Sequence, residues 1–305
     1  MTFKKQLTLG IGFFLTTFCL VAGAPAAENT PKHVRLLATG NSFSRNATQF
    51  LPDIVKAGGD TLTLRQISLS GAPIEVHWRN AAAFQQGETN AAARAWAALK
   101  AEKWDFVTFQ QSSMNSFKIE TYRPFAKQLH DFIKTQAPTA EVVIHETWAY
   151  REDDPLFNKE FSPHDMYRQL HTAYITIAGE LSCRIIPVGD AFQNARADAA
   201  WKGVFPDPNF DYKNSKPPAL PDQTHSLNVG YSWKSDKNGK VSLALDAHHA
   251  STAGRYLAAA VWYEFLFGHS VVGNPFTPPE LSAADVAVLQ RIAHQSVADS
   301  LKPKQ

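Results

Sequence analysis

The most informative segment of the sequence is Val34-Arg35-Leu36-Leu37-Ala38-Thr39-Gly40-Asn41-Ser42-Phe43-Ser44. Its first half is short, apolar and bounded by charge and by a glycine, which is the pattern of a buried strand. The strand stops at Gly40, a residue that can adopt backbone angles that others avoid. From Asn46 onward, apolar residues recur at the spacing of a helix. The stretch therefore predicts a strand, a tight turn and a helix.

Ser42 lies at this turn, just before the first turn of the helix. A hydroxyl is exposed there, and the first free N–H groups of a helix stabilise negative charge. The position suits a nucleophile, but a serine in this place also commonly caps the helix. The turn by itself leaves both interpretations open.

A second polar motif, Asp246-Ala247-His248-His249, stands near the C-terminal end, just before a predicted helix. A serine nucleophile needs a base, and the base needs a group that orients it. Asp246 can orient one imidazole nitrogen of His249 while the other faces Ser42. His248 is the competing base.

The two motifs together resemble the SGNH hydrolases, also called GDSL-like esterases. Gly40-Asn41-Ser42 stands where that superfamily usually has Gly-Asp-Ser, and a bacterial branch of it carries Gly-Asn-Ser-Phe-Ser, as here. The resemblance runs from about Val34 to the last helix. It implies an α/β fold: the three-layer α/β/α flavodoxin-like SGNH hydrolase fold with a mostly parallel central sheet.

The resemblance also implies the roles of the site residues. Ser42, Asp246 and His249 would be catalytic, without metal or cofactor. His249 is selected over His248 because the family motif continues with a small polar residue and a glycine, here Ser251 and Gly254.

An oxyanion hole is implied as well, with the backbone N–H groups of Ser42 and Gly71 as donors. The family's third donor is an asparagine in a Gly-x-Asn-Asp context after the third strand, and this chain lacks that sequence. Gln111 is the predicted replacement and Asn115 the alternative. Either residue can equally be an ordinary loop residue.

Strand and helix patterns alternate along the chain, which predicts a parallel sheet with helices on both faces. Strands are expected at 34–39, 62–67, 104–109, 141–145 and 183–188, and helices near 46–58, 91–102, 122–136, 164–180, 252–267 and 282–298. Residues 202–239, rich in Pro, Asn, Asp and Lys, predict a long functional or disordered loop.

The N-terminal pattern predicts a secretory signal peptide over residues 1–27. Lys4 and Lys5 precede an apolar run from Leu7 to Val21, and small residues follow it. Cleavage would leave a single SGNH hydrolase-like domain, residues 28–305, that is secreted and periplasmic or extracellular, without stable membrane anchoring. Cleavage would also remove Cys19 and leave Cys183 alone, which excludes an intrachain disulfide and predicts a buried structural thiol.

The amino-acid composition limits the classes of partner that the protein is expected to bind. The formal charge of +2 falls to zero when Lys4 and Lys5 are removed, so nothing points to nucleic acid or a membrane surface. The expected partner is a small-molecule or polysaccharide ester, with a carbohydrate O-acetyl ester first and a lipid or short-chain ester second. The sequence leaves the oligomeric state open.

Two other functional classes stay open. A catalytically silent carbohydrate-binding protein would use Trp148, Tyr150, Tyr231 and Trp233 to stack on sugars. A metal-dependent hydrolase would use Asp246, His248 and His249, with His225, to hold zinc, although no cysteine or clear fourth ligand accompanies them.

Overall fold

The computed structural model describes residues 1–2 and 30–302. The chain divides into two units, Met1–Thr30 and Pro31–Gln305. Every helix and strand given below belongs to the second unit. The predicted signal peptide lies almost entirely outside the described residues. Among the helices of the described part, none is long and apolar enough to cross a membrane.

A sheet of five parallel strands forms the centre, in the order β2-β1-β3-β4-β5. β1 has strand neighbours on both sides, and most of its residues are buried. The carboxyl ends of all five strands meet at one edge, where sites form in such sheets. The strands are β1 (His33–Gly40), β2 (Thr61–Ser68), β3 (Phe106–Phe109), β4 (Glu141–His145) and β5 (Arg184–Ile186).

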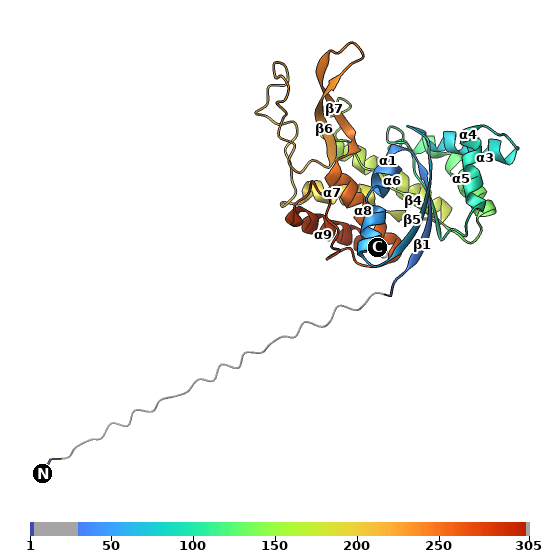
Figure 1. The fold of residues 1–305 in the computed structure, drawn as a ribbon, viewed down its shortest axis with the longest axis horizontal. Coiled ribbons are helices and arrows are strands. Elements are labelled where there is room, and N and C mark those ends of the chain that lie inside the picture. Colours follow the sequence, from blue (N-terminus) through green and yellow to red (C-terminus); the bar gives the residue numbers. More distant parts are fainter. Residues whose placement is uncertain (3–29, 303–305) are drawn as a thin grey trace. The chain divides into compact units, whose positions relative to one another are not determined.

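Two layers of helices cover the sheet (Figure 1). One layer holds α1 (Ser42–Thr48), α2 (Leu51–Ala57), α7 (Val188–Ala197), α8 (Thr252–Phe267) and α9 (Ala283–Ser300). The other holds α3 (Ile74–Gln85), α4 (Ala91–Arg94), α5 (Phe125–Gln136) and α6 (Pro163–Leu181), with the 3₁₀ helices η1 (Ala95–Lys100) and η2 (Ile119–Tyr122). The prediction of a three-layer α/β/α fold with a parallel sheet is confirmed.

α8 is the central helix of its layer. It is apolar all round and buried from Ala253 to Phe267 with the single exception of Arg255, as expected for a helix enclosed by other elements. It contacts α1, α2, α7 and α9. The segment that carries the Asp-x-x-His motif is thereby attached directly to the core.

Several element boundaries differ from the sequence prediction. The helix expected over 46–58 is two helices, α1 and α2, because Pro52 in the first turn of α2 cannot donate the hydrogen bond that a continuous helix needs. The strand expected over 183–188 ends at Ile186, and Pro187 then caps α7. α3 and α7 were not predicted.

The prediction of a loop over residues 202–239 is wrong for the last third of this range. Residues Asn228–Ser235 form β6, which pairs antiparallel with β7 (Val241–Ala250) as a hairpin outside the main sheet. Gly239, with φ of +79°, makes the turn between them. The polar composition that suggested a loop belongs to strands that are largely exposed toward this turn.

Buried His77 in α3 generates a prediction about stability. Burial lowers its pKa from 6.5 to about 4, against a smaller opposing effect of the Gly40 backbone. Between pH 6.5 and 4 the unfolded chain therefore binds a proton at His77 that the folded chain does not, so His77 lowers stability as the pH falls. His77→Leu should flatten the pH dependence of the unfolding free energy by about 1.4 kcal/mol per pH unit in this range.

Urea unfolding of the wild type and of His77→Leu at pH 4.5, 5.25 and 6 measures this difference. His130→Leu is the control, because His130 is only half-buried. Equal slopes for His77→Leu and the wild type would contradict the prediction.

Candidate active site

Ser42 is the first residue of α1, at the carboxyl end of β1. Asn41 is the N-cap, and its side-chain Oδ1 accepts the Phe43 N–H at 3.0 Å. The capping role that a serine could have had here therefore belongs to Asn41. The Ser42 hydroxyl is left to interact with other groups.

A chain of hydrogen bonds joins Ser42 to the C-terminal motif. Ser42 Oγ and His249 Nε2 are 2.9 Å apart, across 207 positions of sequence. His249 Nδ1 lies 2.9 Å from Asp246 Oδ2 and 3.2 Å from Oδ1. The structure thus brings together the three side chains that the sequence singled out, in the order hydroxyl, imidazole, carboxylate.

A β-bulge explains how Asp246 and His249 can interact from one strand. On a regular strand, residues three apart point to opposite faces. In β7, however, Asp246 pairs with Gly230 and Ala250 with Asn228, so that three residues of β7 oppose Val229 alone. The extra residues turn the backbone, and Asp246 Oδ1 accepts the N–H of both His248 and His249, at 3.2 and 3.0 Å.

The bulge is fixed on both sides by the core. Asn46 Oδ1 of α1 accepts the Ala250 N–H at 3.0 Å, and the Ser251 N–H donates to the Leu227 carbonyl at 2.9 Å. Gly254 passes so close to this carbonyl that a Cβ there would lie 2.1 Å from the oxygen. Ser251 caps α8 by accepting the Gly254 N–H. The two residues that follow the motif thus hold the end of β7 in place.

His248 is held in a different environment. Its Nε2 lies 2.7 Å from Asp154 Oδ2, and its ring stacks on Tyr150 at 3.7 Å. The Trp148 indole N–H donates to the His248 carbonyl at 2.9 Å, while the Trp148 ring stacks on Phe43 at 4.3 Å. The two neighbouring histidines therefore have separate carboxylate partners, and only His249 contacts Ser42.

Asp246 is ionised at neutral pH. Its partial burial acts to raise the pKa, but the hydrogen bonds from the His249 side chain and backbone outweigh burial. The pKa of Asp246 is therefore well below its usual range. A carboxylate in this state holds the Nδ1–H tautomer of His249, which leaves Nε2 free to accept the Ser42 proton.

The two predicted backbone donors, Ser42 and Gly71, follow the ends of the neighbouring strands β1 and β2. The Ser42 N–H belongs to the first turn of α1, where no intrahelical acceptor exists. Gly71 follows β2 with φ of +62°, a conformation that favours glycine. Asn41 Nδ2 donates to the Ala72 carbonyl at 3.2 Å, so this side chain links the serine turn to the Gly71 loop.

The Gln111 side chain has another function. Its Oε1 accepts the N–H of Ile74 and Ser112, at 3.0 and 2.8 Å. Its Nε2 donates to the carbonyl and hydroxyl oxygens of Thr121, at 3.1 and 3.2 Å. Every polar atom of this buried amide is engaged in fixing loops, so the prediction of Gln111 as an oxyanion donor does not fit. Asn115, the alternative, is half-buried in the loop after β3.

Gln110, which the sequence analysis passed over, contacts the serine turn instead. Its Nε2 donates to Asn41 Oδ1 at 2.9 Å, and its Oε1 accepts from Ser44 Oγ. A Cβ at Gly40 would lie 2.9 Å from Gln110 Cγ and collide with Ser44 Oγ as well. Gly40 is therefore needed so that Gln110 can reach the turn, and the two residues function together.

His145, at the end of β4, sets the orientation of the Gln110 amide. His145 is fully buried, and burial lowers its pKa to about 3, so the ring is neutral. Its Nδ1 lies 3.0 Å from Gln110 Oε1. With the proton on Nδ1, His145 donates to the amide oxygen and leaves Gln110 Nε2 directed at Asn41.

The zinc site that the sequence left open as an alternative is not assembled in the structure. His225 stacks on Trp201 at 4.6 Å and lies 3.7 Å from Asp285, so it is not gathered with Asp246, His248 and His249. In the part of the chain that the structure describes, those residues form no metal-binding group.

The prediction that four aromatic side chains could stack on sugars is wrong for two of them. Trp148 and Tyr150 are fully buried. Tyr231 and Trp233 of β6 are partly exposed, but they pair with Leu245 and Leu243 and so share the face of the hairpin opposite to Asp246.

Cys183 is half-buried just before β5, and burial raises the pKa of its thiol to about 12. It lies away from Ser42 and fits the predicted structural thiol.

The solved structure of a DUF4886 family protein from Bacteroides uniformis ATCC 8492 is similar, with 25% identity, a TM-score of 0.69, and coverage of 89% of this chain and 97% of that one. A protein proposed to be an SGNH hydrolase, from Slackia heliotrinireducens, has 24% identity, a TM-score of 0.49, and coverage of 76% and 98%.

A lipase/acylhydrolase from Enterococcus faecalis has 13% identity, a TM-score of 0.45, and coverage of 77% and 96%. A search of curated proteins found no match.

One family's sequence model, described as a domain of unknown function, matches residues 35–207, which is more than half of the chain and includes Ser42, Gly71 and Gln110. This protein belongs to the DUF4886 family.

Proposed function

We propose that this protein is an exported serine esterase that hydrolyses carboxylic esters, with O-acetyl groups on carbohydrate as its substrates. The observation that carries the proposal is the hydrogen-bonded chain from Ser42 Oγ through His249 to Asp246, with both connecting distances at 2.9 Å. A hydroxyl, an imidazole and an ionised carboxylate in this order form the arrangement that activates serine in unrelated hydrolases.

In the proposed reaction, Ser42 Oγ attacks the ester carbonyl carbon while His249 Nε2 takes the hydroxyl proton. The carbonyl oxygen becomes negative and is stabilised by the N–H groups of Ser42 and Gly71. The C–O bond to the alcohol then breaks, and His249 returns the proton to the leaving oxygen. Water attacks the acyl group on Ser42 by the same proton transfers, which releases the acid and restores the serine.

The predicted export signal supports the choice of substrate class, because an exported esterase would meet esters outside the cytoplasm, such as those on polysaccharides. Asp246 and His249 lie on β7, a strand of the hairpin outside the main sheet whose other end is exposed to solvent. Release of acetate from acetylated polysaccharides, compared with hydrolysis of p-nitrophenyl acetate and longer acyl esters, tests this choice.

The first prediction from this proposal concerns the three side chains. Ser42→Ala, His249→Ala and Asp246→Asn should each lower kcat for p-nitrophenyl acetate by roughly two to four orders of magnitude, because each breaks the same proton-transfer unit. For that reason the double variant Ser42→Ala/His249→Ala should be little worse than either single one.

His248→Ala is the matched control, since His248 also has a carboxylate partner but makes no contact with Ser42. It should retain most of the activity. An inactive His248→Ala beside an active His249→Ala would refute the assignment.

The second prediction concerns Gln110. Gln110→Met keeps the size of the side chain but removes the hydrogen bonds to Asn41 and His145. The serine turn should then lose its fixed geometry, and kcat should fall roughly ten- to a hundredfold with a smaller change in KM, because positioning matters most in the transition state.

Gln290→Met is the control, because Gln290 is a buried glutamine of α9 that donates to Tyr256 and to the Asn274 carbonyl. It should lower stability without lowering kcat of the folded enzyme. Equal effects of both variants on kcat would show that Gln110 has no special positioning role.

The third prediction concerns export. Protein recovered from outside the cytoplasm should begin near Ala27 or Glu28, because the small-residue cleavage site ends there. Intact-mass spectrometry of the exported protein measures this. A mass that still includes Met1 to Ala24 would overturn the proposal of a cleaved signal.

A further inference from the structure

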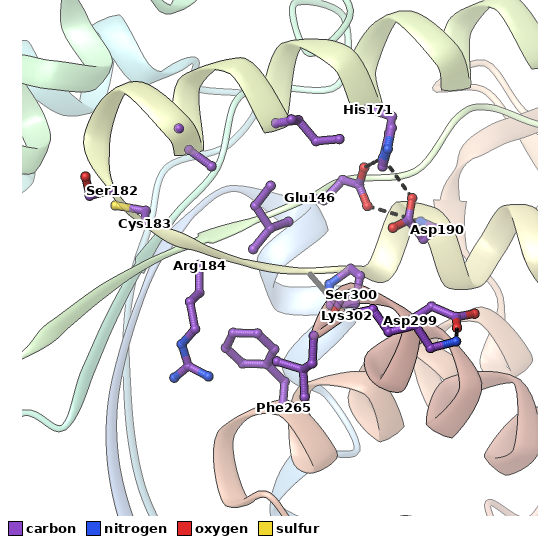
Figure 2. A pocket seen from close by; sticks show the side chains of 16 residues that line it. Glu146, His171, Ser182, Cys183, Arg184, Asp190, Phe265, Asp299, Ser300 and Lys302 are labelled. Carbon is purple, nitrogen blue, oxygen red and sulfur yellow. Dashed lines mark hydrogen bonds and ion pairs between the residues drawn. The ribbon is translucent and has the colours of Figure 1, made fainter. Parts of the chain in front are cut away.

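One cavity lies away from Ser42 and contains a group of side chains that the esterase reaction does not use. Its volume is about 760 Å³, and it runs along β5 between α6 and the C-terminal end of α9. Neither Ser42, Asp246 nor His249 lines it. Figure 2 shows Glu146, His171 and Asp190 pointing toward one another at its rim.

We propose that Glu146, His171 and Asp190 bind a divalent first-row transition-metal ion, with Zn²⁺ and Mn²⁺ as the best-matched ions. The three residues come from different elements: Glu146 follows β4, His171 lies on α6 and Asp190 lies in the first turn of α7. Each offers one ligand atom, and these atoms all lie within 4.8 Å of one another.

The distances between the ligand atoms fit one ion. His171 Nδ1 lies 2.8 Å from Glu146 Oε1 and 2.9 Å from Asp190 Oδ1. Ligands at right angles around an ion with bonds of about 2.1 Å stand about 3 Å apart. The His171 nitrogen can therefore stand next to each carboxylate oxygen around one ion, and the two oxygens lie within 4.8 Å of each other.

An ordinary ion pair accounts for this arrangement less well. Other histidines of the described residues, such as His269 with Asp60 and His294 with Glu264, bring one carboxylate to Nδ1. His171 Nδ1 faces two, and a single N–H cannot point along both directions. Glu146 is only 1% exposed, and burial raises the pKa of its carboxyl to about 7, so a close cation is needed to keep it fully ionised at neutral pH.

Surrounding groups hold the ligands as metal sites require. The Tyr167 hydroxyl donates to Asp190 Oδ1 at 2.8 Å, and the Asp190 N–H donates to Glu146 Oε2 at 3.1 Å. One imidazole with two carboxylates suits Zn²⁺, Mn²⁺ or Fe²⁺ better than Ca²⁺ or Mg²⁺, which prefer oxygen ligands alone. An ion here would join β4, α6 and α7 and so stabilise the fold.

Calorimetric titration of the mature protein, stripped with a chelator and then freed of it, with Zn²⁺, Mn²⁺ and Mg²⁺ tests the site. We expect one Zn²⁺ or Mn²⁺ per chain, much weaker Mg²⁺ binding, and a melting temperature that rises with metal concentration. Glu146→Gln and Asp190→Asn should each lower the affinity at least about a hundredfold, since even residues that only support metal ligands contribute about ten- to a hundredfold.

Glu264→Gln is the matched control, because Glu264 is also buried, pairs with a histidine Nδ1 and accepts a backbone N–H. It should bind metal as the wild type does. Absence of stoichiometric binding by the wild type would overturn the proposal. So would unchanged affinity in both ligand variants, or loss of binding in His249→Ala. Because binding is measured directly, the outcome does not depend on esterase activity.

Discussion

The close approach of Gln110 to Gly40 is the constraint on which the serine turn depends. A side chain at Gly40 would occupy the space of Gln110 Cγ and Ser44 Oγ. Because Gly40 has no side chain, the Gln110 amide can donate to Asn41. Asn41 in turn caps α1 and donates to the Ala72 carbonyl, which holds the Gly71 loop. One buried amide thereby connects the ends of β1 and β3 with the first turn of α1.

His145 extends this network to β4. Because burial keeps its ring neutral, it can donate to the Gln110 carbonyl oxygen, which directs the amide N–H toward Asn41. Three parallel strands thus supply side chains to one network at their carboxyl ends. The network contacts the turn that carries Ser42 and leaves the Ser42 hydroxyl to His249, so the same groups that stabilise the sheet edge also orient Ser42.

The opposing half of the site depends on the β7 bulge. Without it, Asp246 and His249 would point to opposite faces of the hairpin, and the imidazole would lose its partner. The bulge in turn depends on Asn46, Leu227 and Gly254, which attach its end to α1 and α8. Ser42 and His249 lie at hydrogen-bonding distance because both segments are fixed to the same buried helix layer.

Much of this architecture followed from local pattern. The apolar run before Gly40 and the alternation of strands with helices were sufficient to predict the parallel sheet, because periodicity and turn residues act over short distances. The resemblance to SGNH hydrolases was needed to select Ser42, Asp246 and His249 from the polar residues. α3 and α7 were missed because neither begins with a side-chain N-cap: each follows a proline, Pro73 or Pro187, and α7 also begins directly after a strand.

The amino-acid sequence limits which side chains can take part in chemistry, and packing between distant segments sets which of them come into contact. Gln110 and Gln111 are adjacent and chemically identical, yet one orients the serine turn and the other fixes loops, because alternate residues leaving β3 point to opposite sides. Glu146, His171 and Asp190 stand too far apart in sequence to form a motif. They meet only because β4, α6 and α7 pack together, and no local pattern encodes that contact.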